Sequence, residues 1–236
     1  MEVQIGVAKV NKYATSESGD TVETIERPGG GISVVIVDGQ RSGRAAKIIS
    51  NIVARKAISL LGEGVRDGAA ARAAHDYLRM HRNGQVSADL QLLSVDLQTR
   101  SIVISRNTRC PVLCSQQGKL MILNEESEPI GIHPNTKPVI VEMKLQAGIH
   151  IIAYTDGTAE AGAGGPGQLD LAQFVMQAAR DQLPAQELAD QILNAALIAD
   201  SGRPNDDISI VALCVLAHDV PTAARRLSVY FPIVPG

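Results

Sequence analysis

The chain has 236 residues, of which 45% are hydrophobic and 20% charged, and its formal net charge is −3 at pH 7. This composition is typical of a globular protein that buries a substantial core. The negative charge, aromatic residues at only 3% and the lack of tryptophan argue against a nucleic-acid-binding surface, which needs basic patches and stacking side chains.

The first forty residues favour strands. Residues 3–10 are mostly apolar, residues 21–27 alternate as in a half-buried strand, and residues 32–37 form a β-branched run typical of a buried strand. Pro28 and three glycines after it predict a turn between the last two strands.

Helices are predicted in two pairs. Residues 45–60 and 66–80 carry apolar side chains at helical spacing, as do residues 169–179 and 185–199. The other candidate strands are 89–96, 101–105, 111–115, 120–123, 137–145, 149–154 and 206–216. A glycine-rich stretch, residues 162–167, is expected to be flexible.

This order of elements predicts the fold class. Strands outnumber helices and short turns join them, so the sheets should be mostly antiparallel. We expect an α+β fold, in which a β-sandwich of two mostly antiparallel sheets is flanked by helix pairs (α-β-β-α). Residues 1–217 are expected to form one domain. Residues 218–236 would be a C-terminal tail of unknown role, which could pack as an added strand or mediate a contact.

The cysteines and the N-terminal segment indicate in which cellular compartment the protein is expected. Cys110, Cys114 and Cys214 are odd in number and match no disulfide framework, so we expect buried thiols in a reducing compartment. The N-terminal residues lack a signal-peptide pattern, and no apolar run reaches the about 20 residues of a membrane span. These features predict a cytoplasmic protein.

Four aspartates fall at strand ends. Asp20 precedes one predicted strand and Asp38 ends the next, and both are equally far from the middle of the glycine turn between them. A hairpin would therefore place these two carboxylates side by side. Asp156 follows an apolar strand and Asp206 begins the last one, so antiparallel pairing would bring both to one sheet edge. The four could converge at one rim.

Converging carboxylates repel one another unless a cation lies among them. Oxygen ligands favour magnesium, manganese or calcium over zinc or copper. Gly39, directly after Asp38, would let a backbone carbonyl approach such an ion closely. Two such ions about 3.5–4 Å apart can activate a bridging water and stabilise a phosphoryl group. One Asp-Gly at a strand end is usually only a turn, so the joint pattern carries the prediction of a metal centre.

The ordered set of motifs resembles the PPM (type 2C) family of metal-dependent serine/threonine phosphatases, most closely its bacterial SpoIIE-type branch. The matching pieces follow the family's order over about residues 3 to 216: Ser18-Gly19-Asp20, Val37-Asp38-Gly39, Ser42-Gly43, Ala88-Asp89, Ser105-Arg106-Asn107, Tyr154-Thr155-Asp156-Gly157, Glu160-Ala161 and Asn205-Asp206-Asp207. No single motif is specific, but the ordered combination is.

The resemblance implies a centre of two Mn²⁺ or Mg²⁺ ions that activates water to hydrolyse phosphoserine or phosphothreonine. Asp38 would bridge the ions, joined by the carbonyl of Gly39. Asp156 and Asp206 would hold one ion, and Asp20 would contribute to the other side, directly or through water. Asp38, Asp156 and Asp206 are thus the catalytic candidates as well.

The sequence also departs from the family pattern. The family usually has a glycine and a small or apolar residue after the central Asp-Gly, whereas this sequence has Gln40 and Arg41 there. Gln40 cannot donate a proton as the histidine of some relatives can, so protonation of the leaving group has no assigned residue. Asp89 stands where threonine is usual, and Asp207 aligns beside the ligand set. Arg41 or Arg44 could contact a substrate phosphate, or both could be solvated side chains at a helix start.

The resemblance extends to stand-alone RsbX-like enzymes. It implies a phosphorylated STAS-domain protein of a bacterial stress or sigma-factor partner-switching module as substrate, without nucleic-acid or membrane partners. It also implies that residues 42–84 act as a switch that orders the metal site. Two alternatives stay open: a catalytically weak or inactive phosphoprotein-binding module of the same fold, and a phosphatase for a small phosphomonoester, which would usually need a deep apolar pocket.

Overall fold

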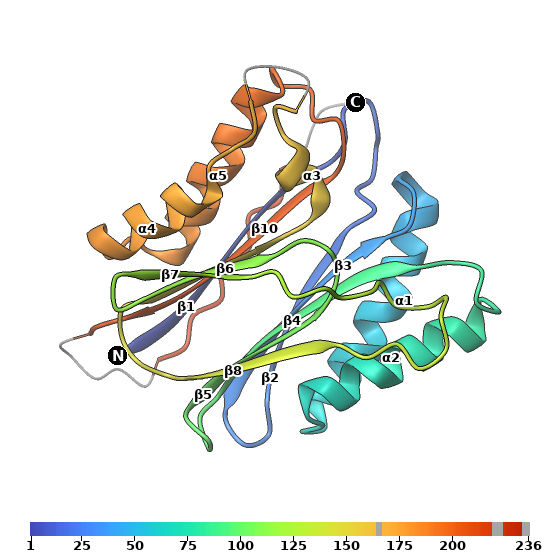
Figure 1. The fold of residues 1–236 in the computed structure, drawn as a ribbon, viewed down its shortest axis with the longest axis horizontal. Helices are drawn as coiled ribbons and strands as arrows, with labels where there is room; N and C mark the ends of the chain where they lie inside the picture. Colours follow the sequence, from blue (N-terminus) through green and yellow to red (C-terminus); the bar gives the residue numbers. More distant parts are fainter. Residues whose placement is uncertain (164–166, 219–223, 233–236) are drawn as a thin grey trace.

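The computed structural model describes residues 1–163, 167–218 and 224–232 (Figure 1). In this part of the chain two five-stranded sheets pack face to face, and helices cover both outer sides. All strand pairs are antiparallel. The predicted fold class, an α-β-β-α sandwich, is therefore confirmed.

The two sheets draw on different parts of the chain. Sheet I has the order β1-β10-β9-β6-β7, with bounds Glu2–Val10, Ile208–Leu216, Ile149–Tyr154, Val112–Gln116 and Lys119–Leu123. Sheet II has the order β2-β3-β4-β5-β8, with bounds Thr21–Glu26, Gly31–Gly39, Ala88–Asp96, Ser101–Asn107 and Val139–Lys144. The N-terminal and C-terminal strands of the domain, β1 and β10, thus lie side by side in sheet I.

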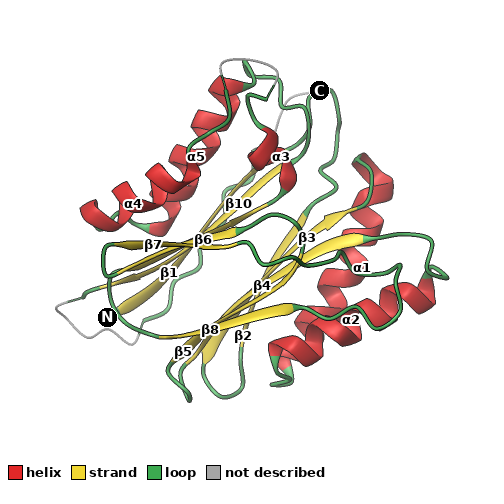
Figure 2. Ribbon diagram, in the orientation of Figure 1, coloured by secondary structure: helices red, strands yellow, loops and turns green. Residues whose placement is uncertain are grey.

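The helices form two pairs, as predicted (Figure 2). α1 (Gly43–Gly62) and α2 (Asp67–His81) cover sheet II, whereas α4 (Leu171–Asp181) and α5 (Ala185–Ala199) cover sheet I. A short fifth helix, α3 (Asp156–Glu160), follows β9. None of the helices in the described ranges is both long and apolar enough to span a membrane.

The pleat of β3 explains how the sandwich positions its site. Val34 and Ile36 belong to the cluster of buried side chains between the sheets, whereas Val35 and Val37 pack under α1 and α2. Because side chains alternate along a strand, Asp38 continues the inner row after Ile36. A carboxylate therefore follows the apolar core at the end of the sandwich.

Some expectations need correction. The last strand begins at Ile208, so Asp206 and Asp207 lie in the turn before it and not in the strand. Helix α3 was not expected, because five residues are too few to show helical periodicity. The described tail residues 224–232 form neither helix nor strand. Of the stretch expected to be flexible, residues 164–166 lie outside the described residues.

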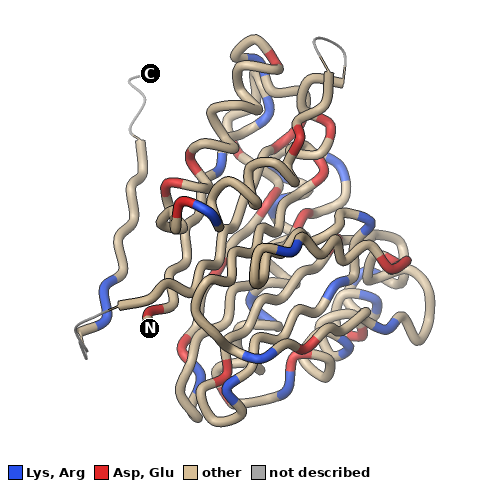
Figure 3. The backbone as a smooth tube through the Cα atoms, turned by 60° about the vertical axis from the view of Figure 1, so that its left-hand side comes forward, with Lys and Arg blue, Asp and Glu red and all other residues tan. Residues whose placement is uncertain are grey.

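The charges are distributed over both layers. Figure 3 shows basic and acidic residues interspersed along the backbone in this view. The three cysteines are free and buried, as expected. The described part of the tail extends beside the two-layer body in the same view, and the guanidinium of Arg225 donates to the carboxylate of Glu26 at the end of β2.

Candidate active site

Sheet II brings three aspartates to one end. In the β2–β3 hairpin Thr21 pairs with Val37, so Asp20 falls opposite Asp38, as the equal spacing about the turn predicted. On the other side of β3, Asp38 pairs directly with Asp89 of β4. Directly opposed residues on one face of a sheet have Cβ atoms about 4.5–5.5 Å apart. The three carboxylates therefore lie on neighbouring strands at the same edge.

Sheet I contributes two more aspartates. Asp156 is the first residue of α3 and is separated from the end of β9 by Thr155 alone, and Asp206 lies two residues before the start of β10. The neighbouring strands β9 and β10 are antiparallel, and the Thr155 amide donates to the Ser209 carbonyl at 3.0 Å, so both aspartates come to the same end. A pocket of about 390 Å³ lies there, lined by Lys12, Asp38, Gly39, Gln40, Arg41, Ser42, Ser87, Ala88, Asp89, Asp156 and Asp206.

Asp20 is buried next to this pocket and links the two sheets. Its Oδ2 accepts hydrogen bonds from Thr155 Oγ1 at 2.9 Å and from Ser209 Oγ at 2.6 Å, both in the sheet I half. The ammonium groups of Lys9 and Lys47 donate to its backbone carbonyl at 2.8 and 2.6 Å. One oxygen of this carboxylate, Oδ1, has no hydrogen-bond partner among the described residues.

Asp207 connects the segment before β10 to the β1–β2 connection. Its Oδ1 accepts from the Lys12 amide at 2.9 Å, and its Oδ2 accepts from the Gly19 amide at 2.8 Å. Both carboxylate oxygens are thus engaged by backbone donors of the β1–β2 connection. Asp207 holds Lys12 and the segment before Asp20 in place and leaves ligand positions to its neighbour Asp206.

Helix α1 packs directly on the segments that carry Asp20 and Asp38. A Cβ added to Gly39 would lie 2.1 Å from the Ala46 carbonyl oxygen, so only glycine allows this approach. The hydroxyl of Ser50 donates to the Gly19 carbonyl. The start of α1 therefore fixes the ends of β2 and β3 relative to each other.

The electrostatics of the site reflect its crowded carboxylates. Burial, followed by the negative charges of Asp20 and Asp156, raises the pKa of Asp38 to about 10. Burial also raises the pKa of Asp20 to about 6, although hydrogen bonds from Ser209 and Thr155 oppose this shift. The pKa of Asp156 is raised by burial and by the charge of Asp206. The site thus favours a bound cation or bound protons.

We expect the metal-free protein to lose stability as the pH rises from about 4, where carboxyls of the unfolded chain titrate, toward about 10, the raised pKa of Asp38. Within this window the folded state holds more protons than the unfolded state, so the free energy of unfolding falls with pH. Urea denaturation in chelator between about pH 5 and 9 measures this slope. The substitution Asp38→Asn should reduce this dependence of the unfolding free energy on pH. A wild-type protein whose unfolding free energy does not change with pH in chelator would contradict the expectation.

The donor set suits a hard divalent cation, because the pocket offers carboxylates and a glycine carbonyl but no sulfur or imidazole among its lining residues. Within the described ranges, no three His, Cys, Asp or Glu side chains are gathered closely enough to enclose one ion. The carboxylates would have to draw together by side-chain rotation when a cation binds.

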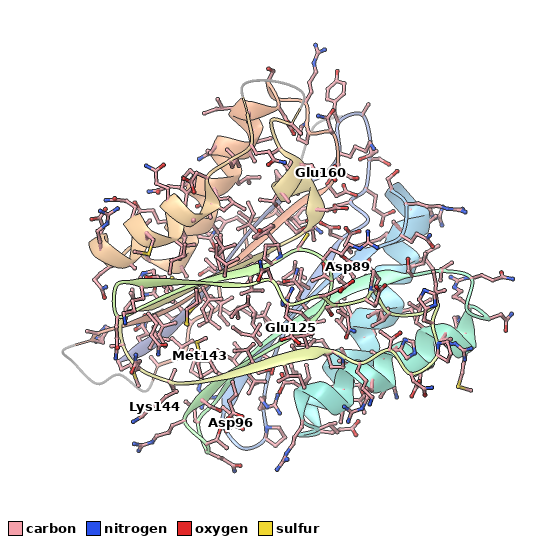
Figure 4. All side chains as sticks on the ribbon, in the orientation of Figure 1. Asp89, Asp96, Glu125, Met143, Lys144 and Glu160 are labelled. Carbon is pink, nitrogen blue, oxygen red and sulfur yellow. The ribbon has the colours of Figure 1, made fainter. Side chains whose placement is uncertain are left out.

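Figure 4 shows three acidic residues at different positions relative to the site. Asp89 lies at the upper end of β4 next to the pocket, whereas Asp96 lies at the opposite end of this strand. The hydroxyl of Thr108 donates to Asp89. Glu160 lies farther out on α3, is exposed and does not line the pocket.

Two charged residues of the pocket, Lys12 and Asp89, are not among the site residues that the sequence predicts. The motifs mark Asp89 only as a departure from threonine, and no motif includes Lys12. The signal for Asp89 was its position at the start of a strand, but the pairing of that strand with β3 was unknown. Of the two arginines considered, Arg41 lines the pocket, and Arg44, in the first turn of α1, does not.

Solved structures with this fold include PP2C-type phosphatase domains. The PP2C phosphatase domain with a regulatory-domain fragment of SpoIIE from Bacillus subtilis superposes with a TM-score of 0.77 at 23% identity, over 93% of this chain and 64% of that one. A structure of RsbU and RsbW domains from Mycobacterium tuberculosis gives 0.76 at 20% identity, over 91% and 62%. RsbX in complex with magnesium gives 0.69 at 15% identity, over 89% and 94%. This chain thus spans less than two thirds of the length of the first two solved chains.

The family model described as Stage II sporulation protein E (SpoIIE) matches residues 28–216. The chain therefore belongs to the SpoIIE family of PP2C-type phosphatases, which confirms the resemblance drawn from its motifs. No curated protein sequence matches the chain significantly.

Proposed function

We propose that the protein is a serine/threonine phosphatase that uses two Mn²⁺ or Mg²⁺ ions. The observation that supports this proposal best is the convergence of aspartates from both sheets on one pocket, in a chain of this family. Asp38, joined by the Gly39 carbonyl, would hold the ions together with Asp156 and Asp206, and Asp20 would contribute directly or through water. Asp38, Asp156 and Asp206 are also the proposed catalytic residues.

Bound ions of this kind supply an activated water and positive charge that stabilises the phosphoryl group during in-line attack. The chain's own residues position those groups. Thr155 and Ser209 orient the Asp20 carboxylate, and Asp207 holds the β1–β2 connection that precedes it. Because Gln40, Arg41 and Asp156 are exposed, the pocket opens to solvent, which suits a phosphorylated side chain presented by another protein.

We further propose a phosphorylated STAS-domain regulator of a partner-switching module as the substrate. This proposal is supported by the structural similarity to proteins named RsbU, RsbW and RsbX. We assign the phosphatase domain to residues 1–217 and leave residues 218–236 as a tail without an assigned role. The buried free cysteines favour a cytoplasmic location.

The test is hydrolysis of a phosphoserine peptide and of a phosphorylated STAS-domain protein, with manganese, with magnesium and with chelator. We expect metal-dependent release of phosphate, faster from the STAS-domain protein. Equal rates on both substrates would remove support for the STAS assignment. Faster turnover of small phosphomonoesters than of either would favour a small-molecule phosphatase.

The alternative is an inactive phosphoprotein-binding module of the same fold. It predicts that the folded protein binds a phosphorylated partner but releases no phosphate with either metal, including when the partner protein itself is the substrate. The retention of Asp38, Asp156 and Asp206 around one pocket favours the enzyme.

A further inference from the structure

The acidic pocket also holds two cationic side chains, Lys12 and Arg41. Lys12 comes from the loop after β1 in sheet I, and Arg41 comes from the loop after β3 in sheet II. Among the described residues neither the Lys12 ammonium nor the Arg41 guanidinium makes a hydrogen bond or ion pair. By contrast, the nearby Lys9 and Lys47 both donate to the Asp20 carbonyl. Two positive groups at the pocket are therefore free to contact a ligand.

Arg41 has a backbone conformation that is unfavourable for an arginine. Its φ is 78°, in the left-handed region, where a residue with a Cβ is less stable than glycine. The preceding residue anchors this turn: the Gln40 amide donates to the Ser87 carbonyl, and the Gln40 side chain accepts from the Ser87 amide, both at 3.1 Å. Unfavourable backbone conformations of this kind cluster at functional sites, where the surrounding structure holds them.

The negative charge of the pocket explains why a phosphate ligand would need the two cationic side chains. Asp38, Asp89, Asp156 and Asp206 line it, and their charges would repel a phosphate dianion that two divalent ions only partly screen. A guanidinium can bind two phosphate oxygens at once, and an ammonium adds a point charge. If Arg41 served only to neutralise the carboxylates, it would pair with one of them, but no such pair is present among the described residues.

We propose that Arg41, with Lys12 from the opposite sheet, binds the phosphoryl oxygens of the substrate and so selects phosphorylated side chains. This inference rests on the proposed function of the same pocket and adds the residues that recognise the phosphate.

The test compares Arg41→Gly with Arg100→Gly. Arg100 also has a left-handed φ, 53°, and is exposed, but it lies in the β4–β5 turn and does not line the pocket. Both substitutions relieve backbone strain, so both should raise Tm in the metal-free protein. Arg41→Gly alone should raise KM for the phosphopeptide about 10- to 100-fold, the loss expected for a charged hydrogen bond, with kcat nearly unchanged.

Two readouts separate recognition from chemistry. Titration calorimetry of Mn²⁺ should give the same metal affinity in all three proteins. Binding of the phosphorylated peptide relative to its unphosphorylated form should weaken only in Arg41→Gly, and partial rescue by Arg41→Lys is expected. This binding assay supports the inference even if the wild type releases no phosphate. Equal phosphopeptide affinity of wild type and Arg41→Gly, or equal weakening by Arg100→Gly, would overturn it.

Discussion

Replacing Asp38 with asparagine should lower metal-dependent phosphate release by about 1,000-fold, the factor expected if the metal centre supplies about 4 kcal/mol of transition-state stabilisation. Asp38 stands in the centre of the constellation, opposite Asp89 in the sheet and opposite Asp20 across the hairpin. Asparagine keeps the shape of the side chain but removes the charge that a cation requires. The kcat/KM for a phosphoserine peptide in manganese measures the effect.

Two further measurements test whether the loss of activity comes from the loss of metal binding. Mn²⁺ affinity should fall in Asp38→Asn, whereas Tm in chelator should rise, because asparagine is neutral in both states and needs none of the proton uptake that folding of the metal-free wild type requires. The exposed Asp76 of α2 serves as the control, and Asp76→Asn should leave activity and metal affinity unchanged. If Asp38→Asn kept wild-type activity and Mn²⁺ affinity, the proposed metal centre would be wrong.

Replacing Asp67 with alanine should destabilise the protein by about 3–5 kcal/mol, the usual cost of leaving a buried charge without its partner. Asp67, the first residue of α2, accepts from Arg27 Nη1 at 3.2 Å, with side-chain exposures of only 6% and 8%. The hydroxyl of Ser94 on β4 also donates to Asp67, and Arg27 Nη2 donates to the Val65 carbonyl at 3.0 Å. The pair joins the start of α2 to the β2–β3 turn.

Urea denaturation measures this loss. The double variant Arg27→Met with Asp67→Ala provides the control, because it removes both charges and should be less destabilised than Asp67→Ala alone. A loss below about 1 kcal/mol in the single variant would show that water or another group replaces the carboxylate, since exposed pairs contribute no more than this.

Much of the architecture could be predicted because it depends on local patterns. Apolar alternation and helical spacing located the strands and both helix pairs within a few residues. The juxtaposition of Asp20 and Asp38 followed from one hairpin, since a tight turn fixes the register of the two strands that it joins. The order of motifs then indicated the family, because it depends on sequence alone.

Only the tertiary structure decided which distant segments complete the site. Asp89 opposes Asp38 across a strand pair separated by two helices, so no local pattern encodes this register. Lys12 reaches the pocket through the contact of its amide with Asp207, far along the chain. The hydroxyls that hold Asp20 come from the other sheet. The sequence by itself indicated the candidate metal ligands. The packing of the two sheets decided which cations and further carboxylates lie beside those ligands.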